Sequence, residues 1–192
     1  MENKTACAEI LNRPELKKVR FKDGFLDWLD QNGFFIKPAS ISHHGMEPGD
    51  LWKHSLQVAD SLVTLTNRNQ LKWQRPGSPW VVGLFHDLCK MDNYTMEIDD
   101  PGHELFGGDV VGRTYSFGYN KELLMDGHGD KSVMMLAPWV DLTEEEVAAI
   151  RWHMGAFDEK TNWNYYGKAV ERWPNVLWTH TADMIAARLI GV

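Results

Sequence analysis

The chain has little cysteine, little positive charge and no long apolar run. Two cysteines, Cys7 and Cys89, offer no disulfide framework, so a reducing cytoplasm is the expected compartment. The 20 basic residues against 27 acidic ones give a net charge of −7, which argues against a basic surface for nucleic acid. No segment approaches the ~20 apolar residues that a membrane span requires, and the N-terminus lacks a signal-peptide core. We expect a cytoplasmic protein that binds no membrane and forms no stable complex with nucleic acid.

What the chain does have is the composition of a globular protein, 43% hydrophobic and 24% charged. Its 192 residues suffice for one domain with a substantial core and are too few to argue for two. Small anionic substrates remain compatible with the negative net charge, provided that local cations or metal ions oppose it.

Helical signals dominate the sequence. Apolar spacing predicts a helix within residues 24–35, which Asn32 and Gly33 terminate, and another over 51–68, with Asp50 as the expected cap. The segment WVVGLFHDLCK is either a helix or a buried strand by periodicity, and we favour a helix because no alternating partner strand is evident nearby. Residues 92–127 are rich in Gly, Asp, Asn and Tyr and show no convincing strand. The predicted fold class is therefore all-α, a helical bundle.

Two further helix starts have a chemical signature. Thr143 and Glu146 form the pattern of a capping box, and the three acidic residues 144–146 suit a helix N-terminus without any catalytic role. Pro174 opens the last predicted helix, over residues 174–190.

Metal-binding residue types occur inside otherwise apolar segments. Each one alone is more typical of a hydrogen-bonded core residue, but imidazoles and carboxylates together suit divalent transition ions, and helical bundles collect such ligands from facing helices. Lys90 lies one turn after His86 and can share its face, whereas His86 and Asp87 point roughly 100° apart on an ideal helix. The residues concerned are His54, His86, Asp87, His128, His153 and Asp183.

These residues lie in segments that resemble a known family. WKHSLQVA looks like a helix with a first ligand histidine, FHDLCK like a His-Asp-x-x-Lys motif, and HTADMIAA like an Ala-Asp helix. In this order they resemble the HD-domain superfamily of metal-dependent phosphohydrolases, over residues 43–188. The segments HGDKSV and IRWHMGAFD are similar to the additional histidine positions of HD proteins that hold two metals.

The resemblance implies a compact HD-type helical bundle as a single domain over 1–192, with an N-terminal helical extension (1–42) and an HD core (43–190). It also implies two divalent ions, of Mn, Fe, Co, Ni or Zn. His54, His86, Asp87 and Asp183 would hold one ion; His128 and His153 would complete the second, with Asp87 bridging both.

The implied activity is hydrolysis of a nucleotide or another small phosphate ester by a metal-activated water. Asp87 would be a ligand and would orient the attacking hydroxide, while Lys90 would offset charge in the transition state. Lys90, Lys131 and Ser132 would bind the substrate phosphate. Two alternatives remain: oxidative cleavage at two irons with dioxygen, as in some HD proteins, and a non-catalytic nucleotide sensor.

Several assignments stay open at the level of sequence. His103 competes with His128 as the third histidine; we prefer His128 because a helix-forming segment follows it. His43 and His44 either line the pocket entrance or are exposed loop residues. No Gly-Tyr-Pro follows the fourth histidine, so the chain is not placed in the branch that cleaves cyclic di-GMP. The substrate, monoester or diester chemistry, the number of ions and the oligomeric state are not determined.

Two residues near the expected ligands have alternative explanations. Arg151 should point away from His153, which favours a structural ion pair. His180, one turn before Asp183, is either a residue that orients that carboxylate or a hydrogen-bonded core histidine.

Overall fold

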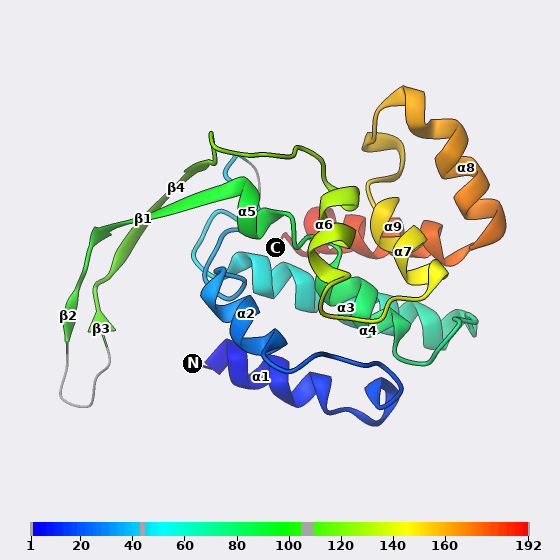
Figure 1. Cartoon of the computed structure of the whole chain (residues 1–192), viewed down its shortest axis with the longest axis horizontal. Coiled ribbons are helices and arrows are strands. Elements are labelled where there is room, and N and C mark those ends of the chain that lie inside the picture. Colours follow the sequence, from blue (N-terminus) through cyan, green and yellow to red (C-terminus); the bar gives the residue numbers. More distant parts are fainter. Residues whose placement is uncertain (1, 43–44, 105–109, 192) are drawn as a thin grey trace.

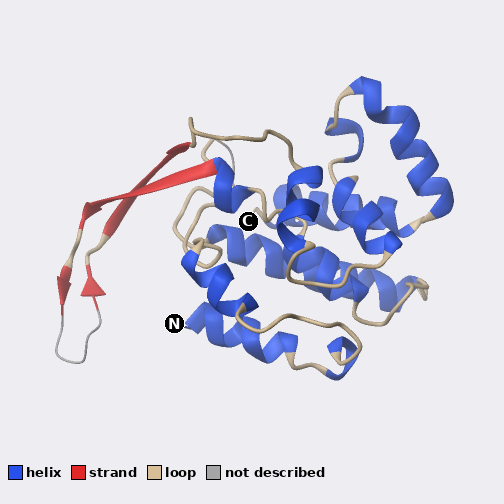
Figure 2. Cartoon of the chain, viewed as in Figure 1, coloured by secondary structure: helices blue, strands red, loops and turns tan. Residues whose placement is uncertain are grey.

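The computed structural model describes residues 2–42, 45–104 and 110–191, and within them the protein is mostly helical, with two short two-stranded sheets (Figures 1 and 2). The α-helices are α1 (Glu2–Leu11), α2 (Phe25–Gln31), α3 (Asp50–Asn69), α4 (Ser78–Phe85), α5 (Lys90–Asn93), α6 (Gly129–Leu136), α7 (Glu144–Arg151), α8 (Trp163–Arg172) and α9 (Asn175–Ile185). Shorter helical turns are η1 (Pro14–Leu16), η2 (Gly155–Phe157), η3 (Lys160–Asn162) and η4 (Ala186–Ile190), the last a π-helix.

The long helix α3 is the centre of the fold. It packs against α4 and α9, and Leu51, Val58 and Leu62 of its apolar stripe are fully buried. Gly83 lets α4 approach closely, because a Cβ there would lie only 2.3 Å from the Ala59 Cα. This close packing of α3 and α4 brings the segments of His54 and of His86-Asp87 together.

Several expected helix boundaries are confirmed, but the helix expected over WVVGLFHDLCK ends at Phe85 and does not continue to Lys90. The Thr143 hydroxyl accepts a hydrogen bond from the Glu146 amide at 3.2 Å, and the Glu146 carboxylate accepts one from the Thr143 amide at 2.9 Å, which completes the capping box. The expected cap of α3 was wrong by one residue. Gly49, at φ 85°, is the N-cap, and Asp50 is the first helical residue, whose carboxylate accepts from the Glu47 amide at 2.9 Å.

Residues 94–119 correct the expectation of a purely helical fold. Strands β1 (Tyr94–Asp100) and β4 (Thr114–Tyr119) pair antiparallel, and β2 (His103–Glu104) pairs with β3 (Val110–Val111) farther out. Together they form an arm that extends away from the helices (Figure 1, left). Apolar and polar residues alternate along β1 and β4, as in a strand, but both strands are short and largely exposed. The many turn-forming residues around them therefore led to the prediction of an irregular segment.

Two lysines attach the base of this arm to the helical body. The Lys37 ammonium donates to the carbonyl oxygens of Met91 and Tyr94, the latter at 2.7 Å. The Lys131 ammonium lies 2.6 Å from an Asp92 carboxylate oxygen and donates to the side-chain oxygen of Asn93 at 2.7 Å. These contacts fix the segment that directly follows Lys90.

The N-terminal helices share the core of the remaining chain. Phe25 of α2 packs edge-on against Phe85 of α4, with ring centroids 5.2 Å apart, and Cys7 and Leu16 belong to the same buried cluster. Phe85 is fully buried, which anchors the end of α4 just before His86. Within the described ranges, no helix combines the length and apolar content that crossing a bilayer demands.

Candidate metal centre

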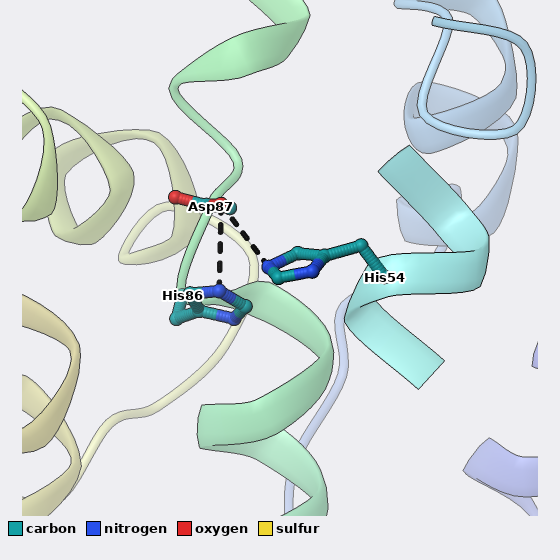
Figure 3. A group of neighbouring side chains, drawn as sticks. All are labelled: His54, His86 and Asp87. Atoms are coloured by element: carbon teal, nitrogen blue, oxygen red, sulfur yellow. Dashed lines mark ion pairs between the residues drawn. The ribbon is translucent and has the colours of Figure 1, made fainter. Parts of the chain in front are cut away.

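The His-Asp pair lies where α4 ends. The α-helix ends at Phe85, and His86 and Asp87 occupy the turns between α4 and α5. The His86 Nε2 atom lies 3.4 Å from Asp87 Oδ2, and His54 Nε2, from α3, lies 3.7 Å from the same oxygen (Figure 3). The two neighbouring side chains thus converge, although ideal helix spacing would have separated them.

Three other segments bring the remaining predicted ligands to the same place. His128 is the N-cap residue of α6, His153 follows the end of α7, and Asp183 lies on α9. Asp183 Oδ1 is 3.2 Å from His54 Nε2 and 3.9 Å from His86 Nε2. All six predicted ligands therefore lie in one largely buried group, which the ligand-atom separations make compatible with bound metal.

The two oxygens of Asp87 face different halves of this group. Oδ2 is directed to His54 and His86, at 3.7 and 3.4 Å. Oδ1 is directed to His128 and His153, at 2.7 and 3.4 Å from their Nε2 atoms. One carboxylate therefore lies between two pairs of imidazoles.

The backbone fixes the ring orientation of two histidines. The Nδ1 atoms of His86 and His153 lie 2.9 Å from the Gly83 carbonyl oxygen and 2.7 Å from the Ile150 carbonyl oxygen. Because a carbonyl only accepts, each Nδ1 carries a hydrogen, and in the neutral ring Nε2 presents a lone pair. Among the described residues, neither buried Nε2 has a hydrogen-bond partner.

The distances between the histidine Nε2 atoms and the neighbouring carboxylates favour a cation bound between them. Ligand atoms at ~2.0–2.2 Å from one ion are separated by roughly 3–3.6 Å when they lie about a right angle or a tetrahedral angle apart. Most of the separations around Asp87 and Asp183, between 3.2 and 3.9 Å, are near this range and too long for strong charged hydrogen bonds. A lone pair directed at a carboxylate is unfavourable unless a positive charge lies between them. The donor set therefore fits a divalent transition ion.

Both carboxylates in the group remain charged at neutral pH. Burial favours the protonated form of Asp87, but its neighbours outweigh burial, above all the Lys90 ammonium and after it the His86 and His128 rings, and hold the pKa of Asp87 well below its usual range. Burial also favours the protonated form of Asp183, but its pKa is lowered, and the contact with His54 Nε2, at 3.2 Å, contributes most to that lowering. Two buried carboxylates thus supply negative charge to a metal.

Burial and the neighbouring charges also change the pKa values of two histidines and of Lys90. Burial lowers the pKa of His86, which keeps its ring neutral. Burial opposes charge on His153 as well, but its contact with Asp87 prevails and raises the pKa, so this site attracts a proton or a metal ion. Burial likewise opposes the Lys90 ammonium, and the Asp87 carboxylate, 2.5 Å away, raises its pKa.

A cavity of about 220 Å³ opens onto this group. Asp87 and Asp183 lie on its lining, together with two cations, Lys90 and Arg188. The sequence interpretation did not assign Arg188. The only signal was a basic residue shortly after the Ala-Asp helix motif, and the π-helical turn η4 places it on the cavity.

Two predicted phosphate-binding residues lie elsewhere. Lys131 is buried and bound to Asp92, Asn93 and the Met125 carbonyl oxygen at the base of the arm. The Ser132 hydroxyl accepts a hydrogen bond from the Cys89 amide at 3.1 Å. Neither residue lines the cavity at the metal centre, and both have structural partners.

The competing histidines are separated by the structure. His103 lies on β2 in the exposed arm, away from the group that contains His128. His180 contacts the His153 carbonyl oxygen at 2.7 Å through Nδ1, so it supports the His153 segment rather than Asp183. His43 and His44 lie outside the described residues.

The predicted structural role of Arg151 is confirmed. Its guanidinium pairs with Asp130 and, at 2.7 Å, with Asp158, and it lies 3.9 Å over the Trp152 ring.

Two glycines bring the histidine segments close together. A Cβ on Gly129 would lie 2.2 Å from the Arg151 carbonyl oxygen, so only glycine lets the start of α6 touch the end of α7. Gly155, at φ 56°, packs against the His180 ring, where a Cβ would lie 2.8 Å from Nδ1. Gly129 directly follows His128, and Gly155 follows His153 by two residues. A glycine close after a histidine was therefore a signal for these ligands that the sequence interpretation did not use.

Metal binding should be visible as thermal stabilisation. A divalent transition ion at about 100 times its Kd adds about 2.7 kcal/mol to the free energy of unfolding. For a chain of this size, this corresponds to a rise in Tm of about 5–10 °C, measured by differential scanning fluorimetry. We expect the shift in the wild type and in His103→Ala, and its loss in His153→Ala. Equal shifts in all three proteins, or none with any of Mn, Fe, Co, Ni and Zn, would contradict the assignment.

The comparisons with known proteins add no relative: no family model, no curated protein and no solved structure matched this chain.

Proposed function

We propose that this protein is a metal-dependent phosphohydrolase of the HD type, acting on a small phosphate ester. The observation that carries the proposal is the position of Asp87, whose two oxygens face separate pairs of buried imidazoles. The sequence resemblance supplies the reaction class, and the cavity beside the group supplies a place for the substrate. The reaction adds water across the ester: the P–O bond to the leaving group breaks, and phosphate and an alcohol result.

The ligand assignment follows the two halves of the group. His54, His86, Asp87 and Asp183 would hold one ion, and Asp87, His128 and His153 the other. Two bound divalent ions supply a hydroxide at neutral pH and neutralise phosphoryl oxygens. The metal-binding groups are oriented and charged by the chain itself, because backbone carbonyls orient two of the imidazole rings and both carboxylates stay ionised.

The cations on the cavity wall suit a phosphate. Lys90 is held beside Asp87 by a 2.5 Å ion pair, and Arg188 lies on the same cavity. Fixed positive charges near a phosphoryl group stabilise the charge that develops on its oxygens in the transition state. The net charge of the whole chain is −7, so these two residues and the metal ions are what would attract an anionic substrate.

The reaction class is tested with a panel of phosphate esters. Purified protein supplied with Mn, Fe, Co, Ni or Zn should release phosphate from at least one nucleotide or small phosphate ester. Iron binding with oxygen consumption and no phosphate release would instead support the oxidative alternative. Ligand-induced stabilisation without any product would support a sensor.

Lys90 separates phosphate binding from metal binding. Replacing Lys90 by methionine should lower kcat by about 10²–10³-fold, the usual cost of one lost charge-stabilising donor. Metal content, measured by elemental analysis, should stay at the wild-type value, since Lys90 offers no lone pair while it remains an ammonium ion. Lys90→Arg keeps the charge and should retain more activity. An unchanged kcat in Lys90→Met, or loss of the metal, would contradict the assigned role.

A further inference from the structure

A second cavity, of about 330 Å³, adjoins the metal centre. Its lining shares His128 and Met154 with the first cavity, so these two side chains form the boundary between the two spaces. We call it the leaving-group cavity. A substrate whose phosphate lies at the metal centre would have room for its leaving group on the far side of this boundary.

The charge of the leaving-group cavity is opposite to that of the first one. Three carboxylates, of Asp130, Asp158 and Glu159, stand against one guanidinium, of Arg151, which leaves a formal charge of −2. The Arg151 guanidinium is already engaged by Asp130 and Asp158. A second phosphate group would therefore meet repulsion here, whereas a neutral group that donates hydrogen bonds would be accepted.

Acceptor atoms are available on this wall. The Asn162 side-chain nitrogen donates to Asp158 at 3.0 Å, so the other atom of this amide group, an oxygen, is an acceptor on the cavity lining. The exposed Glu159 carboxylate has one long contact, 3.4 Å, from the Thr161 hydroxyl. The ribose hydroxyls and the amino or imino groups of a nucleobase are donors of the matching kind.

An aromatic ring completes the lining. Phe157, on η2, is 62% exposed, and its centroid lies 6.1 Å from that of His180. A large apolar side chain left open on a cavity wall offers a flat surface to a planar ligand, and base–aromatic stacking is a common and sequence-tolerant contribution to nucleotide binding.

From these features we infer that the leaving-group cavity binds the nucleoside part of a nucleoside monophosphate, with the base on Phe157 and its donors toward Glu159 and Asn162. The inference rests on the proposed function and narrows its substrate class. Nucleoside diphosphates and triphosphates would be poorer substrates, because their further phosphates would meet the carboxylates.

Turnover of paired substrates tests the inference. The probes are the four ribonucleoside monophosphates and β-glycerophosphate, which has no aromatic group. We expect a higher kcat/KM for at least one nucleoside monophosphate than for β-glycerophosphate. Phe157→Ala should reduce this ratio about tenfold through KM, as the loss of one stacking contact predicts. Tyr165→Ala removes an exposed aromatic ring of α8 that does not line the cavity, and should leave the ratio unchanged.

Equal kcat/KM for both substrate types, or a ratio that Phe157→Ala does not change, would overturn the inference while the phosphohydrolase remains. If no ester is hydrolysed, the proposed function fails. Calorimetric titration of the metal-loaded full-length protein with the four nucleosides then tests separately whether the leaving-group cavity binds a nucleoside. Binding that Phe157→Ala weakens about tenfold would support the cavity as a nucleoside site. No binding, or equal binding to both proteins, would overturn it.

Discussion

Replacing Asp87 by asparagine is expected to lower phosphate release by about a thousandfold. The substitution preserves the shape of the side chain but removes the negative charge and one of the two oxygens that face the imidazole pairs. Metal-ion catalysis contributes several kcal/mol of charge stabilisation, and about 4 kcal/mol corresponds to a thousandfold in rate. Phosphate release and bound metal per chain, measured on the same sample, should both fall.

A matched control for this variant lies on the arm. Asp99→Asn removes a carboxylate on β1 that accepts a hydrogen bond from the Ser116 hydroxyl at 2.8 Å and does not belong to the group of six predicted ligands. Its activity and metal content should equal those of the wild type. An Asp87→Asn protein with wild-type metal content and activity would rule out Asp87 as the bridging ligand.

The largest effect on stability is expected at the start of α7. The Glu146 carboxylate is fully buried and accepts hydrogen bonds from Arg75 at 2.5 and 2.7 Å and from Ser78 at 2.8 Å. Removing one partner of a buried pair leaves an uncompensated charge. Arg75→Ala should therefore lower the free energy of unfolding by about 3–5 kcal/mol, measured by urea denaturation.

The same helix provides an exposed pair of identical chemistry for comparison. Arg172 and Glu144 lie 2.9 Å apart, but both side chains are exposed. Arg172→Ala should cost about 0–1 kcal/mol, as exposed ion pairs usually do. Similar losses in the two variants would show that burial of Glu146 does not determine the effect.

Sequence patterns were sufficient for the elements that depend on local chemistry. The capping box at Thr143 and Glu146, and the end of α2 just before Asn32 and Gly33, are set by residues a few positions apart. The start of α3 was missed by one residue. The N-cap is Gly49, which adopts a left-handed conformation and makes no side-chain cap, whereas the sequence suggested a capping side chain at Asp50.

The arm was missed although its pattern is visible in retrospect. Tyr94, Met96 and Ile98 alternate with polar residues on β1, and Tyr115 and Phe117 do so on β4. A two-stranded sheet that projects from the body buries little apolar surface, so its strands carry a weaker hydrophobic signal than core strands do.

The candidate metal centre shows a different limit. Residue types singled out its six members, and the family resemblance assigned them as ligands. Helix geometry argued against a joint approach by His86 and Asp87, because it could not show that α4 ends at Phe85. Lys131 has the right charge for a phosphate and faces the arm instead, while Arg188 reaches the cavity through a π-helical turn. Which basic residue faces the site depends on tertiary packing.

The most direct test of the account measures bound metal and phosphate release in the same sample. We predict that the released phosphate rises with bound metal per chain, that chelation removes both, and that adding the metal back restores both. Phosphate release that persists in metal-free protein, or fully metal-loaded protein that hydrolyses no ester in the panel, would contradict the proposal.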